Sequence, residues 1–222
     1  MATSRTPILF VLTLTVLFPM ANSQTFDSFW FVQQWPPGVC AFQPVPCVQP
    51  NLESFTIHGL WPQKGRTSAT GCHGTDFTYD KISLLESPLN ATWPDVIGGN
   101  QKQFWRHEWN KHGKCSEKTF RQSTYFWISI HMRNRFRLLY TLGVAGIVPN
   151  NGTKEKIQVQ KAIKQSFRTE PILRCTTPSK RPTSPSVVIA RLAEIVMCFA
   201  DNGITLINCD ATKSTCPKKF IF

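Results

Sequence analysis

The chain has 222 residues, and its 25 lysine and arginine residues against 13 aspartate and glutamate residues give a formal net charge of +12. A charge of this sign attracts polyanions, of which nucleic acid, cell-wall pectin and anionic membranes all remain open. The eight cysteines form an even set without a Cys-x-x-Cys pair, which favours disulfides over thiol chemistry and argues against a zinc ribbon.

Residues 1–23 predict a secretory signal peptide. Arg5 precedes an apolar run from Ile8 to Phe18, and Ala21-Asn-Ser23 provides a small-x-small cleavage pattern. The run is too short to span a bilayer, and no later segment is long and apolar enough to do so. We therefore expect a soluble, secreted mature chain, residues 24–222, with a net charge of +11.

Two early segments have the pattern of strands. Residues 26–35 are rich in aromatic side chains and stop before two prolines, which predicts a buried strand. Residues 54–59 alternate, which places His58 on the face opposite Phe55 and Ile57. The second strand thus presents His58.

The middle of the chain is helical in pattern, and its end returns to strands. Helices are predicted over residues 101–112, 118–132, 135–142 and 154–167. Residues 190–199 and 204–209 alternate weakly around Asp201-Asn-Gly203, a good hairpin turn, and the proline-rich residues 176–186 predict a surface loop. This order predicts one α+β domain, with a mostly antiparallel sheet and helices on one side.

Residues 104–115 hold an unusual cluster of polar side chains. His107, Glu108, Lys111 and His112 lie within six residues, and on a helix Lys111 would lie beside His107 and His112 beside Glu108. A lone His or Glu on a helix is usually solvated surface, but this combination suits acid–base catalysis. The zinc-protease motif His-Glu-x-x-His needs ligands four apart, whereas these histidines are five apart, so a metal site is disfavoured.

Neighbouring residues favour rigid supports for such a site. Trp105 and Trp109 form a separate stripe that can anchor the helix, and Gly113 is expected to end it. Gly59 permits a close approach by backbone or ligand, and Trp61-Pro62 is expected to fix the following loop. Two histidines on separate rigid elements suit a reaction that needs one acid and one base near neutral pH.

The chain resembles the ribonuclease T2 family, including the plant pistil S-RNases and their S-like relatives. Phe55 to Pro62 and Phe104 to Cys115 match the two catalytic segments of that family. The resemblance extends through residues 26–37 and 93–96, Glu194-Ile to Cys198, and Asn208-Cys209. It implies a secreted endoribonuclease that cleaves single-stranded RNA and needs no metal or other cofactor.

The resemblance also implies roles for individual residues. His112 is expected to take the proton of the ribose 2′-OH, and His58 to protonate the departing 5′-oxygen. This leaves a 2′,3′-cyclic phosphate, which water then opens with the roles reversed. His107, Glu108 and Lys111 are expected to bind the phosphate and stabilise the pentacoordinate transition state.

The base-binding positions of the family correspond to Gln34, Asp95, Val96 and Phe104. Phe104 can stack on a base and Gln34 can hydrogen-bond to one, although Phe104 and Val96 also suit a core. Asp95 stands where some relatives carry Asn, and a carboxylate cannot read a base as an amide does. The base preference therefore stays open.

Covalent features complete the expectation. The resemblance implies four disulfides, of which the last pair flanks the predicted hairpin turn: Cys40–Cys47, Cys72–Cys115, Cys175–Cys216 and Cys198–Cys209. Two Asn-x-Thr sequons predict N-linked glycans at Asn90 and Asn151. We interpret most tryptophans, Trp61 among them, as scaffold. Arg133, Arg135 and Arg137 are interpreted as a solvated basic face that could help to hold RNA phosphates.

Two classes of function stay open. One is the endoribonuclease, and the other is a catalytically idle basic glycoprotein that binds a polyanion; the full catalytic set favours the first. Pistil self-incompatibility ribonucleases tend to be basic and S-like ribonucleases acidic, so the charge favours the pistil type or a close paralogue, with defence or phosphate recycling as the alternative. We expect RNA as substrate, a protein partner in the self-incompatibility case, no membrane association and a monomer.

Overall fold

The structure is a computed structural model that describes residues 26–178 and 190–222. The predicted signal peptide, residues 1–23, and most of the predicted loop at 176–186 lie outside these residues. Within the described part, no helix has both the length and the apolar character to cross a membrane.

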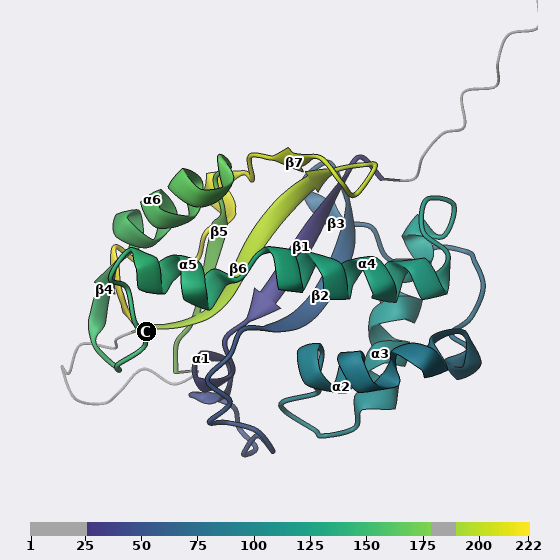
Figure 1. The fold of residues 1–222 in the computed structure, drawn as a ribbon, viewed down its shortest axis with the longest axis horizontal. Helices are drawn as coiled ribbons and strands as arrows, with labels where there is room; N and C mark the ends of the chain where they lie inside the picture. The colour runs from purple at the N-terminus through teal and green to yellow at the C-terminus, as the bar shows by residue number, and fades with distance from the viewer. Residues whose placement is uncertain (1–25, 179–189) are drawn as a thin grey trace, which may run out of the picture.

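An eight-stranded sheet forms the centre of the molecule (Figure 1). Its strands are β1 (Ser28–Gln34), β2 (Thr56–Lys64), β3 (Thr67–Ser68), β4 (Thr153–Glu155), β5 (Ile172–Thr176), β6 (Arg191–Ala200), β7 (Leu206–Ile207) and β8 (Lys219–Ile221). The order is β3-β2-β1-β6-β8-β4, and β5 and β7 also pair with β6. Among the described strands, β6 and β8 are the only parallel pair, so the predicted α+β domain with a mostly antiparallel sheet is confirmed.

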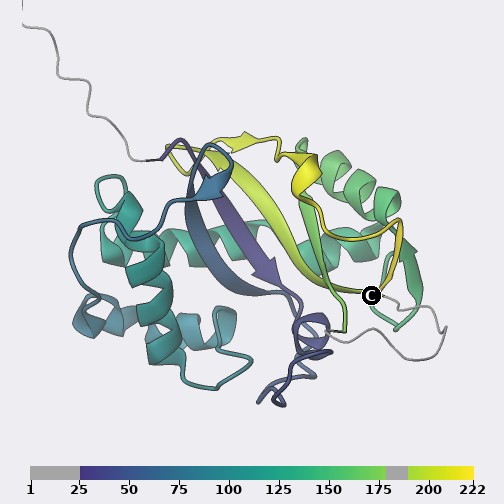
Figure 2. The same cartoon turned by 180° about the vertical axis from the view of Figure 1, so that it is seen from behind.

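Helices cover one face of the sheet. In Figure 1, α4 (Gln122–Arg135) and α5 (Leu138–Val144) cross in front of the strands, whereas from behind, in Figure 2, β1, β2 and β6 lie uncovered. The other helices are α1 (Pro36–Cys40), α2 (Glu86–Thr92), α3 (Gln101–Lys111), α6 (Lys156–Phe167) and three 3₁₀ turns, Tyr79–Leu85, Gly113–Ser116 and Ala211–Lys213. The sheet therefore has a helix-covered face and an open face.

Strand alternation assigns residues to these two faces. Phe31 and Met197, paired between β1 and β6, belong to the main core, whereas their neighbours Val32 and Val196 belong to a smaller cluster with Trp61. The same alternation places Gln33 and Gln34, the last two residues of β1, on opposite faces of the sheet. Gln34 lies directly opposite Glu194 in the β1–β6 register, which places a polar pair among the residues of the open face.

Several local predictions differ from the structure. β2 continues through Trp61-Pro62 to Lys64, where a loop was expected, because it pairs with β1 as far as Gln63 and with β3 at Gln63 and Lys64. Strand β5, which pairs with β6, falls in a segment for which no strand was expected. Gly113 follows α3 without a positive φ and begins a 3₁₀ turn; a Cβ there would lie 2.6 Å from Trp109, so close packing requires the glycine.

The structure contains four disulfides, and they join the cysteines in the pairs that the resemblance implies: Cys40–Cys47, Cys72–Cys115, Cys175–Cys216 and Cys198–Cys209. The bond at Cys115 ties the turn that follows α3 to the loop after β3. It therefore fixes the end of the helix that carries the polar cluster.

Candidate active site

Helix α3 is held rigidly by its buried stripe. Its N-cap, Asn100, accepts a hydrogen bond from the backbone N–H of Gln103 at 3.1 Å. Trp105 and Trp109 are fully buried, and their indole N–H groups donate to the carbonyl oxygens of Trp93 at 2.8 Å and Thr75 at 2.9 Å. The helix can therefore present its polar side chains in a fixed orientation.

The polar cluster of α3 divides into a buried and an exposed pair. Glu108 and His112 are 2% and 5% exposed, whereas His107 and Lys111 lie at the surface. All four line a cavity of about 430 Å³ together with His58 from β2. The fold thus joins the two histidines predicted to work together.

Trp61 is the contact between the two histidines. Its ring centroid lies 4.9 Å from that of His58, edge to face, and 5.1 Å from that of His112, stacked at 29°. Its indole N–H donates to Glu108 Oε2 at 2.7 Å. The interpretation of Trp61 as scaffold alone was therefore incomplete, because this side chain touches three of the predicted catalytic residues.

Gly59 makes this arrangement sterically feasible. A Cβ at Gly59 would lie 2.1 Å from the Trp61 indole nitrogen and 2.4 Å from Glu108 Oε2, so any larger residue would separate these two groups. The carbonyl oxygen of His58 accepts a hydrogen bond from Trp93 Nε1 at 3.0 Å. The close approach expected at this glycine is therefore made by side chains of the site.

Glu194 completes the environment of His58. Its Oε1 lies 2.5 Å from His58 Nδ1, and its Oε2 accepts a hydrogen bond from Arg174 Nη1 at 3.1 Å. Arg174, on β5, lies over the Trp61 ring at 5.6 Å. No role was predicted for Glu194 or Arg174 from the sequence, and they reach His58 only because β5, β6, β1 and β2 are neighbours.

The surroundings move the pKa values of the two histidines in opposite directions. Burial would lower the pKa of His58, but the charge and hydrogen bond of Glu194 outweigh it, so the pKa is raised. Burial, followed by the positive charges of Lys111, His58 and His107, lowers the pKa of His112 to about 3. Near neutral pH this favours a protonated His58 and a neutral His112, the states that an acid and a base require.

The two buried carboxyl groups also differ. Burial raises the pKa of Glu108, against the opposing effects of His58 and the Trp61 hydrogen bond. Burial would also raise the pKa of Glu194, but His58 and Arg174 outweigh it and lower the pKa. Glu194 is therefore the carboxylate that stabilises a charged histidine.

The predicted base-binding residues line a second cavity of about 370 Å³, which shares His58 and Phe104 with the first. Gln34 is 3% exposed, and its Nε2 has no hydrogen-bond partner among the described residues. Val96 is fully enclosed, and the Asp95 carboxylate accepts hydrogen bonds from the backbone N–H groups of residues 97, 98 and 100. Asp95 thus shapes its own loop, whereas Gln34 keeps an unused donor.

Within residues 26–178 and 190–222, no three His, Cys, Asp or Glu side chains are placed together so that they could hold a metal ion.

Comparison with known proteins shows the family of the chain. The model of the ribonuclease T2 family matches residues 26–209. Ribonuclease MC of Momordica charantia is 47% identical over 89% of this chain and 100% of its own length. The solved structure of ribonuclease MC1 from the seeds of bitter gourd has a TM-score of 0.82 and covers 89% of this chain and 100% of its own. Ribonuclease S-7 of Nicotiana alata is 34% identical over 96% of this chain and 93% of its own.

A ribonuclease-like storage protein of Panax ginseng is also similar, with 32% identity over 82% of this chain and 74% of its own. The family match spans most of the chain and includes both histidine-bearing segments. The chain belongs to the ribonuclease T2 family and is an endoribonuclease of that type.

Proposed function

We propose that this enzyme cleaves single-stranded RNA by transphosphorylation, with no metal ion. Neutral His112 takes the proton of the 2′-OH, and the 2′-oxygen forms a bond to phosphorus as the bond to the 5′-oxygen breaks. Protonated His58 donates its proton to that leaving oxygen, and the product is a 2′,3′-cyclic phosphate. Water then opens the ring, with the two histidines in reversed roles.

One observation carries this proposal. His58 and His112 both pack on Trp61 in one cavity, and their surroundings favour the protonated form of the first and the neutral form of the second. Lys111 and His107 line the same cavity from its exposed side, where they can bind the phosphate as negative charge develops. Glu108, held by Trp61, is the remaining group that can contact the phosphate.

We further propose that the neighbouring cavity binds a base. Its unused Gln34 N–H donor supports this role, as does Phe104, which lies at the boundary with the catalytic cavity, with its ring 6.0 Å from that of His58. Variants of ribonuclease MC1 have been solved in complex with 5′-GMP and with 5′-UMP. We assign Val96 and Asp95 to the wall of this cavity and to the shape of its loop.

The mechanism predicts cleavage of RNA in the presence of EDTA and none of the corresponding DNA. The nucleophile is the 2′-OH of the substrate itself, so a deoxy substrate has nothing to activate. The purified protein should be assayed with EDTA on an RNA oligonucleotide and on the same oligonucleotide with one deoxyribose at the scissile position. Loss of RNA cleavage in EDTA, or cleavage at the deoxyribose, would contradict the mechanism.

We propose that the mature protein is secreted, begins at Gln24 and carries glycans at Asn90 and Asn151. The four disulfides support secretion, because disulfides form and persist in oxidising compartments such as the extracellular space. Both asparagines are exposed, and Asn90 lies on α2. Intact mass of the secreted protein before and after enzymatic deglycosylation, with N-terminal sequencing, tests the cleavage site and both glycans.

For the physiological role, two observations point in different directions. The +11 charge favours a pistil self-incompatibility ribonuclease, with a protein partner in that response, or a close paralogue. Identity is higher to a ribonuclease of seeds, 47%, than to ribonuclease S-7, 34%, which favours an S-like role in defence or phosphate recycling. Net charge changes with few substitutions, so we propose the S-like role. Transcript restricted to the style would instead support self-incompatibility.

A further inference from the structure

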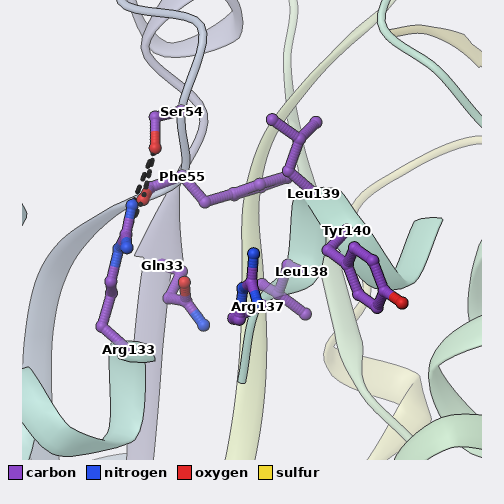
Figure 3. Close-up of a pocket in the computed structure, with 8 residues that line it drawn as sticks. All are labelled: Gln33, Ser54, Phe55, Arg133, Arg137, Leu138, Leu139 and Tyr140. Carbon is purple, nitrogen blue, oxygen red and sulfur yellow. Dashed lines mark hydrogen bonds between the residues drawn. The ribbon is translucent and has the colours of Figure 1, made fainter. Parts of the chain in front are cut away.

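A separate cavity of about 330 Å³ lies where α4 meets α5 on the helix-covered face of the sheet. We call it the arginine pocket, and its lining includes Gln33, Arg133, Arg137 and Tyr140 (Figure 3). Gln33 directly precedes Gln34 on β1, and successive strand residues point to opposite faces. The sheet itself therefore separates the arginine pocket from the base cavity that Gln34 lines.

The two arginines are held differently. Arg133 donates from Nη2 to Ser54 Oγ at 2.8 Å and from Nε to the carbonyl oxygen of Phe55 at 3.3 Å, so neutral acceptors fix its guanidinium in place. Arg137 is exposed and lies over the ring of Tyr140 at 5.1 Å. Figure 3 shows the Gln33 side chain between the two.

The charge of the arginine pocket is uncompensated. Neither Arg133 nor Arg137 forms an ion pair with a carboxylate in the described part of the chain. Burial is the larger cause of a lowered pKa of the Arg133 guanidinium, and the positive charge of Arg137 adds to it because the two cations repel each other. An anion bound in the pocket would offset the positive charge of both arginines.

We propose that the arginine pocket binds a phosphate group of RNA or of a nucleotide, at a site separate from the catalytic cavity. A guanidinium group matches phosphate oxygens in geometry and charge. Arg133 lines the pocket and is held in place by Ser54 and Phe55, while its charge has no anionic partner among the described residues. Tyr140, 63% exposed beside Arg137, offers a ring on which an attached base can stack. The cavity volume is within the range of small-molecule sites, about 300–1,000 Å³.

The test is a titration of the ¹⁵N-labelled protein with inorganic phosphate, followed by NMR. Backbone amides of residues 137–140 report on the arginine pocket, and those of residues 107–112 report separately on the catalytic cavity. We expect the first group to shift with a saturable response that Arg137→Gln weakens about tenfold, since one charged contact is lost. Arg135→Gln is the matched control, because Arg135 lies over Phe136 and does not line the pocket.

Kinetic measurements then distinguish the two sources of phosphate. If RNA is the ligand, Arg137→Gln raises KM for a long RNA with kcat unchanged, and dinucleotide cleavage stays as in the wild type. If a free nucleotide is the ligand, RNA kinetics are unchanged and 5′-UMP shifts the same amides at lower concentration than phosphate does. An Arg137→Gln protein that binds phosphate at residues 137–140 as tightly as Arg135→Gln does would overturn the proposal, whatever the catalytic amides show.

Discussion

Replacing either His58 or His112 with alanine is expected to lower kcat by about 10²–10⁴-fold, the usual contribution of one positioned proton transfer. The first change removes the proton for the leaving oxygen, and the second removes the base for the 2′-OH. Because both transfers belong to one step, the double variant should be little slower than either single one. Steady-state rates on a dinucleotide, measured for all three variants, test this.

Circular dichroism is the control for folding, since neither histidine belongs to the buried stripe of α3 or to a disulfide. His107→Ala should be milder and act mainly on KM, because its expected partner is the phosphate rather than a moving proton. Glu108→Gln keeps the shape and the acceptor for the Trp61 indole while it removes the charge. Losses that multiply in the His58→Ala, His112→Ala double variant would show that the two residues do not share a step.

Glu194→Gln is expected to move the alkaline limb of the pH–rate profile to lower pH and to reduce kcat. The acid, His58, must be protonated, so activity is lost as the pH rises through its pKa. Glu194 raises that pKa, and without it burial and the Arg174 charge act in the opposite direction, so the pKa falls. The acid limb follows the pKa of His112, which must be neutral to act as the base, and this limb should not move. The loss in kcat can reach about 10⁴-fold, the effect of neutralising the histidine-orienting Asp of serine proteases.

Glu170→Gln is a suitable control, because Glu170 pairs with Lys164 and lines neither cavity of the open face. It removes the same charge and should leave both limbs in place. The profile of kcat/KM is the measurement of choice, since it reports the groups of the free enzyme. An alkaline limb that stays in place in folded Glu194→Gln would mean that another group supplies the proton.

The local parts of the site could be predicted from the sequence. Helical spacing places Glu108 beside His112 and sets Trp105 and Trp109 on the anchoring stripe, because helix geometry relates residues that are close in the chain. Strand alternation likewise places His58 on the face opposite the buried Phe55 and Ile57. The order of strands and helices gave the α+β class, since each element must bury one face.

The partners of His58 could not be predicted in this way. Glu194 is 136 residues away from His58 and reaches it only through the strand order β2-β1-β6, and Arg174 arrives on β5, a strand that the pattern did not reveal. Trp61 looked like scaffold because burial of a tryptophan is the common case, and its contacts with both histidines depend on how β2 faces α3. These contacts depend on the pairing of segments that are distant in the chain, and local sequence periodicity does not predict such pairing.

The central claim is that this fold keeps His58 protonated and His112 neutral at the same pH. NMR titration of the imidazole Cε1–H signals, assigned with the His58→Ala and His112→Ala proteins, measures it directly. We predict that His58 titrates above the ordinary histidine value of 6.5 and that His112 stays neutral far into the acid range, with a pKa of about 3. A His112 signal that titrates at a higher pH than that of His58 would contradict the assignment of base and acid.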